Sequence, residues 1–164
     1  MRDFRDIPER LLGPLSGRGD DAWFAAPPGK WCPGEIVDHV ATAMENSARG
    51  FASRLDKPAM TRRPRSMVQR VASFLVLSLG WFPVRRQAPE STRPATRPDR
   101  AATEAKLKDA CTRLIELEKT LAHRSQDIFL KHPVLGDLTI GEFNRFHVRH
   151  AEHHRKQVVA RLTA

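Results

Sequence analysis

Apolar residues recur at helical spacing in five segments of this chain, and no segment alternates apolar and polar residues over a useful strand length. Residues three and four positions apart share one face of a helix, so each segment can bury a stripe against its neighbours. The pattern predicts helices over residues 3–15, 33–55, 66–79, 99–121 and 140–162. We therefore expect an all-α fold, an up-down four-helix bundle with a long crossover loop.

The expected helix starts carry suitable capping residues. Pro33 suits the first helical position, because the N–H that proline lacks would have no partner there. Glu35 places negative charge near the positive end of the helix dipole, and Asp99 is a good N-cap. Capping-box spacing, in which two side chains satisfy each other's backbone N–H groups, occurs at Ser66–Gln69 and Thr139–Glu142.

The segment 66–79 is apolar on nearly every side, which is typical of a buried helix. It is followed by a basic stretch rich in proline and arginine, residues 80–98, which we expect to form the crossover loop. The chain has 164 residues, which fits the roughly 100–200 residues of one domain. We therefore expect a single helical domain over residues 1–164.

The net charge of +9 is concentrated in one part of the chain. Between Arg62 and Arg100 there are nine arginines but only two acids, Glu90 and Asp99. Such a stretch can bind nucleic acid or another anionic surface, and it can also steer an anionic substrate. Basic turns are more often simply solvated, so nucleic-acid binding is the weakest of the alternatives considered below.

No apolar run reaches the ~20 residues needed to cross a bilayer, and the charged start of the chain lacks the apolar region of a signal peptide. We expect a cytoplasmic protein without a membrane partner. Cys32 and Cys111 are the only cysteines, and they form no CxxC pair. Structural roles are therefore expected for both, rather than a disulfide or a thiolate zinc site.

His150 and His154 form the most informative pair in the sequence. They are four positions apart in the last expected helix, so both project from the face that also carries apolar residues. Two inward-facing imidazoles at this spacing suit a divalent metal ion but bind it weakly by themselves. His39 lies on the apolar side of the second expected helix and is the natural third ligand.

The other histidines have different explanations. His147 lies one turn before the pair and is either a fourth ligand or a proton shuttle. His153 is expected to be solvated, whereas His123 and His132 are expected to be structural. A histidine on an apolar face is often only a hydrogen-bonded core residue, so packing without a metal is the alternative to a binding site.

Side chains that could orient the imidazoles are harder to identify. Asp38 and Glu152 adjoin candidate ligands in the sequence but should point elsewhere on their helices. Gln157 could close the edge of the site. Glu35, one turn before His39, is another candidate, although its charge at the helix start explains it more simply.

Two blocks of the sequence resemble those of the DinB-like superfamily, which includes the YfiT-like group. The segment WCPGEIVDHV resembles the block in which tryptophan, serine or threonine, proline and glutamate precede a histidine. The segment FHVRHAEHHRKQV resembles the C-terminal histidine-rich element, and HPVLGDLTIGEF resembles the turn that leads into it. Cys32 stands where serine or threonine is usual, which should weaken the N-cap.

The resemblance implies a four-helix bundle that holds a divalent metal. The ligands would be the histidine of the first block and two residues four apart in the second, which here are His39, His150 and His154. Characterised members include transferases and isomerases that use low-molecular-weight thiols. The basic stretch between residues 62 and 100 has no counterpart in the resemblance.

Three neutral imidazoles leave open coordination positions on a metal, which is typical of catalytic rather than structural sites. Zinc is the expected metal, and the ligands also suit nickel, iron and manganese. We expect a metal-dependent enzyme acting on a small molecule, either a thiol-dependent transferase or a hydrolase. The alternatives are a metal-binding or stress-related protein without turnover, and a binder of nucleic acid through Arg62–Arg100. A homodimer is compatible with each of these three functions.

Overall fold

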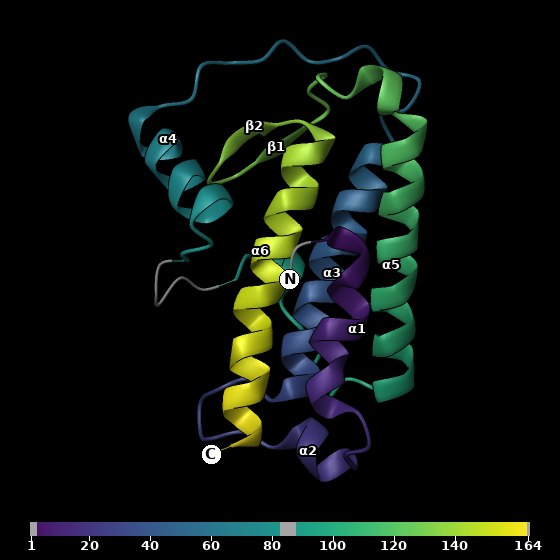
Figure 1. The fold of residues 1–164 in the computed structure, drawn as a ribbon, viewed down its shortest axis with the longest axis vertical. Helices are drawn as coiled ribbons and strands as arrows, with labels where there is room; N and C mark the ends of the chain where they lie inside the picture. Colours follow the sequence, from purple (N-terminus) through teal and green to yellow (C-terminus); the bar gives the residue numbers. More distant parts are fainter. Residues whose placement is uncertain (1–2, 83–87, 164) are drawn as a thin grey trace.

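The structure is a computed structural model, and it describes residues 3–82 and 88–163. It is mostly helical, and its body consists of α1 (Ile7–Leu12), α3 (Pro33–Ala52), α5 (Arg100–Thr120) and α6 (Ile140–Leu162). α3 packs against both α5 and α6, and α1 contacts α5 and α6 from the opposite side (Figure 1). The buried apolar side chains of these helices form the core between them.

The N-terminal helical segment is shorter and more broken than predicted. α1 is flanked by 3₁₀ turns at Phe4–Asp6 and Gly13–Leu15, so three short pieces replace one helix over residues 3–15. A further short helix, α2 (Asp20–Phe24), was not predicted. Its Trp23 is fully buried, donates a hydrogen bond from Nε1 to the Pro98 carbonyl, and lies so close to Gly34 that a Cβ there would collide with the indole.

The start of α3 confirms the predicted positions of Pro33 and Glu35. Pro33 is the first helical residue, and Glu35 accepts a hydrogen bond from the Cys32 N–H at 2.9 Å. In return, the Cys32 thiol sulfur accepts one from the Glu35 N–H at 3.5 Å. A capping box is therefore complete even with cysteine in the N-cap position. The predicted caps at Ser66, Asp99 and Thr139 are also present.

α3 and α5 run in the same direction, and α6 runs against both (Figure 1). Asp38, early in α3, pairs with Lys106, early in α5, whereas Phe51, late in α3, packs on Phe143, early in α6. A parallel pair of helices requires a connection that returns along their whole length. The predicted crossover supplies that return, although residues 83–87 of the expected loop over 80–98 lie outside the described residues.

The prediction of a buried helix over residues 66–79 is wrong. This segment forms α4 (Met67–Ser73) and a π-helical turn at Phe74–Ser78, and it stands beside the body of the protein (Figure 1). Met67, Val68 and Val71 are between 53% and 74% exposed. Because α4 packs through one side only, its apolar pattern does not translate into burial.

A short antiparallel hairpin precedes α6. It consists of β1 (Leu130–His132) and β2 (Gly136–Leu138), with Leu130 opposite Leu138. Strands of three residues are too short to show alternation, which is why the sequence predicted an all-α fold. His132 has the structural role expected of it, because its Nδ1 accepts hydrogen bonds from two backbone N–H groups of the hairpin turn, at 3.2 and 3.1 Å.

Several arginines of the basic stretch are engaged in local ion pairs. Arg63 contacts Asp137 at 2.6 Å, and Arg62 and Arg65 contact Glu142 at 2.7 and 2.9 Å. These pairs join the segment before α4 to the hairpin and to the start of α6. Part of the positive charge that could have formed an anion-binding surface is thus neutralised within the chain.

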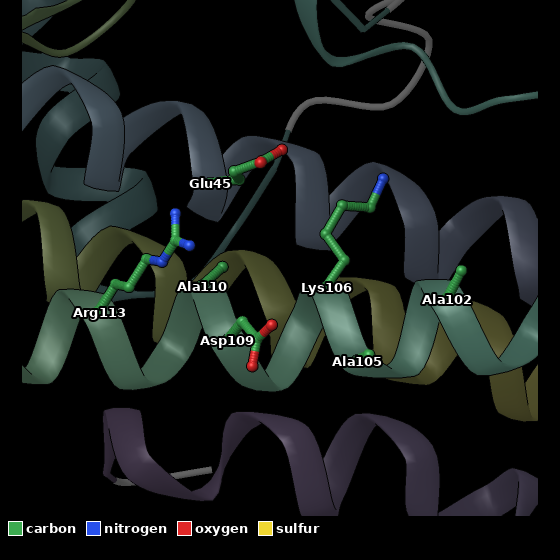
Figure 2. Close-up of a pocket in the computed structure, with 7 residues that line it drawn as sticks. All are labelled: Glu45, Ala102, Ala105, Lys106, Asp109, Ala110 and Arg113. Atoms are coloured by element: carbon green, nitrogen blue, oxygen red, sulfur yellow. The ribbon is translucent and has the colours of Figure 1, made fainter.

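A shallow pocket of about 280 Å³ lies between α3 and α5. In Figure 2, Lys106 and Arg113 extend from α5 towards α3, which carries Glu45, and Asp109 of α5 also lines the pocket. Two acids and two bases balance there, so the pocket has no strong preference for a charged ligand. Among the described residues, no helix combines the length and the apolar character that crossing a bilayer requires.

Candidate metal centre

The three histidines predicted as ligands meet inside the protein. His39 comes from α3, His150 and His154 come from α6, and each is at most 8% exposed. One ligand nitrogen of each lies within 4.8 Å of the others. The Nε2 atom of His150 is 3.2 Å from that of His39 and 3.1 Å from that of His154. Two nitrogens bound tetrahedrally to zinc, at about 2.0–2.1 Å each, lie about 3.3 Å apart.

Hydrogen bonds determine which nitrogen of His39 and His154 faces the centre. The Nδ1 of His39 lies 2.6 Å from the carbonyl oxygen of Thr92 and must donate to it, because a carbonyl only accepts. The Nδ1 of His154 donates to the side-chain oxygen of Gln157 at 2.9 Å. In the neutral rings, both Nε2 atoms therefore direct lone pairs towards His150. Metal-binding histidines are oriented by such partners in other proteins.

His150 cannot satisfy both of these neighbours by itself. A proton on its Nε2 can be donated to His39 or to His154, but one lone pair is then left unpaired. Its Nδ1 is buried and has no hydrogen-bond partner in the described part of the chain, and its ring stacks on Phe146 at 5.2 Å. A divalent cation among the three Nε2 atoms would satisfy all of them, so the donor set fits such an ion.

Burial keeps the three imidazoles in the form that binds metals. It lowers the pKa of His39 below the ordinary value and that of His154 to about 3, and together with the neighbouring histidines it holds the pKa of His150 well below the ordinary value. Each ring is therefore neutral near neutral pH. A neutral imidazole has the free lone pair that coordination requires.

The crossover supplies the hydrogen-bond acceptor for His39. Its residues Glu90–Thr92 form a 3₁₀ turn that lies against α3, where Asn46 donates a hydrogen bond to the Ser91 carbonyl at 2.8 Å. The Thr92 carbonyl is thereby placed over His39. Sequence reasoning missed this contact because the acceptor is a backbone carbonyl, which leaves no side-chain signature.

Asp38 also holds this part of the crossover, through a residue that follows Thr92. Its carboxylate accepts a hydrogen bond from the Ala95 N–H at 2.8 Å and forms an ion pair with Lys106. Asp38 is 4% exposed, so this carboxylate is buried with both partners. As predicted, it points away from the ligands, but it helps to position Thr92.

Gln157 lies at the edge of the site, where the sequence predicted it. It accepts from His154 and donates from its Nε2 to the Nε2 of His153 at 3.1 Å. The expectation that His153 is solvated is wrong, because this residue is half-buried and its ring lies 4.9 Å from that of Phe82. His153 therefore belongs to the rim of the site.

His147 is not brought into the cluster of ligand nitrogens, which among the described residues consists of the other three histidines. Its Nε2 lies 2.9 Å from the Ser47 hydroxyl oxygen, and burial lowers its pKa to about 3. Such a pKa is poorly matched to proton transfer near neutral pH. The position of His147 outside the cluster thus gives no support to the fourth-ligand role, and its pKa gives none to the proton-shuttle role.

A cavity of about 1630 Å³ opens beside the three histidines. Parts of α3, α4, α6, the hairpin and the crossover line it. Near the histidines its wall is aromatic, with Trp31 5.1 Å from His39 and Phe82 5.8 Å from His150, measured between ring centres. An apolar wall of this kind strengthens electrostatic interactions at the site.

The fold and the convergent imidazoles define a helical protein with a buried three-histidine site that could hold a metal ion. The chain belongs to the family described as protein of unknown function (DUF1569), whose sequence model matches residues 22–161. This range includes all three histidines and the crossover. No curated protein and no solved structure matches the chain.

Replacing Gln157 with leucine should weaken zinc binding by about 10- to 100-fold, because the Nδ1–H of His154 loses its acceptor. Leucine has a similar size, so the packing around the ring should change little. Competition with a zinc-binding dye measures the affinity. Gln126→Leu, at an exposed position, is the matched control, and equal affinities of the two variants would contradict the orienting role.

We expect the metal-free protein to lose stability as the pH falls below 6.5. Burial lowers the pKa of His132 from 6.5 to about 4 and that of His147 to about 3. Between pH 6.5 and about 4 for His132, and between pH 6.5 and about 3 for His147, the unfolded chain binds a proton that the folded chain does not. The free energy of unfolding should therefore decrease by about 1.4 kcal/mol per pH unit for each such histidine.

The stabilisation from these histidines is complete above pH 6.5 and is lost as the pH falls towards about 4 and then about 3. Urea unfolding at several pH values in this window, with a chelator present, measures the slope. His132→Asn should show a shallower slope than the parent. A free energy of unfolding that stays constant over the window would contradict the prediction.

Proposed function

We propose that this protein is a metal-dependent enzyme of the DinB-like superfamily, with a divalent ion, preferentially zinc, held by His39, His150 and His154. One observation carries the proposal: three buried Nε2 atoms converge beside a large cavity, and two of the rings are oriented through their Nδ1 atoms. The two sequence blocks that resemble the superfamily contain the same histidines, which supports the assignment.

The proposed fold is the four-helix bundle of that superfamily. Its members would be α1, α3, α5 and α6, with α2, α4 and the hairpin as additions. The parallel pair α3 and α5 and the long crossover are consistent with a bundle that contains one such connection. In this arrangement, facing helices provide the ligands, as in other bundles that bind metals in their core.

The proposed substrate is a small molecule that enters the cavity, and the reaction is thiol-dependent transfer or hydrolysis. A bound divalent ion would supply Lewis-acid chemistry, either for a water molecule or for a substrate thiol. The chain itself orients the ligands through the Thr92 carbonyl and Gln157, and aromatic side chains line the cavity beside them. Among the residues that the structure describes, three protein ligands converge, which leaves room for substrate.

Metal analysis followed by an activity screen tests this proposal. Purified protein should contain about one zinc per chain, and the double variant His39→Ala, His150→Ala should contain none. The metal-loaded protein should then turn over low-molecular-weight thiols with electrophiles, or small esters and amides, and the double variant should not. Equal metal content in both proteins would overturn the site. Tight binding without turnover would favour a non-catalytic metal-binding protein.

A further inference from the structure

α4 presents an apolar stripe to the cavity beside the three histidines. The stripe consists of Val68, Val71 and Ala72 of α4 and of Leu75 in the π-helical turn that follows it, and all four line the cavity. Their spacing of three and four residues places them along one side of the helical segment. Val68 is 74% exposed and Val71 is 53% exposed. The stripe is thus partly uncovered in the folded chain, chiefly at Val68 and Val71, and forms a wall of the cavity.

The apolar wall continues from α4 to the candidate metal centre. Phe82, which follows the π-helical turn, lines the same cavity as the α4 stripe and the histidines. Its ring is 6.4 Å from that of Phe146 and 5.8 Å from that of His150. Phe146 in turn stacks on His150. A ligand that reaches the histidines can therefore extend along apolar side chains over its remaining length.

The charged residues that line the cavity are mostly basic. Among the described residues they comprise four bases, Lys30, Arg93, Lys131 and Arg161, and one acid, Glu35. Glu35 is already engaged by the Cys32 N–H at the start of α3. A negatively charged head group is consequently favoured over a positively charged one, and a divalent ion with three neutral ligands has the same preference.

The burial of the histidines distinguishes between two molecules that could cover the apolar wall, a small ligand and a second copy of this chain. The three histidines are at most 8% exposed, so the surface of a second protein cannot reach them. An unbranched chain of carbon atoms is narrow enough to lie along α4 while its head group contacts the histidines. The continuity of the wall with the buried site therefore favours a small amphiphilic ligand over a second copy of this chain.

On the basis of the proposed function, we infer that the substrate is an amphiphilic anion. Its head group would bear the donor atom that reaches the metal between His39, His150 and His154. Its aliphatic tail would lie along Val68, Val71 and Leu75. This inference assigns a function to the exposed apolar face of α4, which the proposed metal chemistry alone does not explain.

A series of alkyl hydroxamates on the zinc-loaded protein tests the inference. The head group of acetohydroxamate, butanohydroxamate, hexanohydroxamate and octanohydroxamate is the same metal-binding anion, so only the tail differs. We expect the dissociation constant, measured by calorimetry, to fall by about fourfold for each added methylene. A dissociation constant independent of chain length would overturn the inference and leave the metal site intact.

Two variants locate the tail. Val71 and Phe74 are similarly exposed, at 53% and 59%, but only Val71 lines the cavity. Val71→Asp should abolish the preference for octanohydroxamate over acetohydroxamate and retain full zinc content, whereas Phe74→Asp should keep the preference. Circular dichroism verifies that both variants fold.

The remaining outcomes of these experiments would each contradict one part of the inference: the position of the tail, the identity of the ligand or the metal site itself. Equal loss of the chain-length preference in both variants, or its retention in Val71→Asp, would show that the tail does not lie in the cavity. Dissociation of a dimer by both substitutions, seen by sedimentation, would assign the face to a second copy of the chain. Failure of the parent protein to bind zinc would overturn the proposed function itself, and metal analysis detects that failure before any hydroxamate is added.

Discussion

His150→Ala should lower the affinity for zinc by roughly 100- to 1000-fold. Structural zinc sites with four ligands gain about 10–16 kcal/mol in total, so one ligand accounts for about 3–4 kcal/mol. His150 is the central donor, with its Nε2 within 3.2 Å of those of both His39 and His154. The two remaining imidazoles would bind an ion only weakly.

Zinc titration against a chromophoric chelator measures this loss. His123, for which a structural role was expected, is exposed instead. His123→Ala therefore removes one imidazole from the surface and should leave the affinity unchanged. His147→Ala tests whether His147 is a fourth ligand. Because His147 lies outside the cluster of ligand nitrogens, this variant should lose much less zinc affinity than His150→Ala. An affinity of His150→Ala within about threefold of the parent, for a folded protein, would rule out the three-histidine site.

Asp38→Ala should lower the free energy of unfolding by about 2–3 kcal/mol, which is below the usual range for a broken buried ion pair because Lys106 retains some contact with water. The carboxylate is buried, and the side chain of Lys106 is 32% exposed. The Ala95 N–H also loses its acceptor. Zinc affinity should fall about tenfold, since the crossover that carries Thr92 is no longer held in place.

Urea unfolding and zinc competition together test this prediction. Asp109→Ala is the control, because Asp109 is an exposed acid on α5 beside the pocket of Figure 2. Asp38→Asn retains an acceptor oxygen for Ala95 but loses the ion pair. It should therefore bind zinc more tightly than Asp38→Ala. Similar zinc affinities for the parent and Asp38→Ala would show that the crossover does not position His39.

The candidate ligands could be predicted because their geometry is local. Residues four apart in a helix project together whatever surrounds the helix, so His150 and His154 follow from the sequence alone. The position of His39 on the apolar side of its helix follows from the same periodicity. The start of α6 was also predictable, because its Thr139–Glu142 capping box involves only neighbours in the chain.

Contacts between distant segments could not be predicted in this way. The Thr92 carbonyl reaches His39 only after the crossover has folded back along α3, and nothing in the sequence around Thr92 indicates that contact. The exposure of α4 has the same origin. Its apolar residues predicted burial, but whether a helix is covered depends on which neighbours reach it.

The sequence by itself determined the helical class, the helix caps and the three histidines, since each depends on spacing within one segment or on which side of a helix is apolar. Only the tertiary structure decided that the rings meet through their Nε2 atoms, that the crossover orients one of them, and that α4 lines a cavity. These features depend on how segments far apart in the chain pack together. Periodicity gives the direction in which a side chain points, but packing decides what it meets.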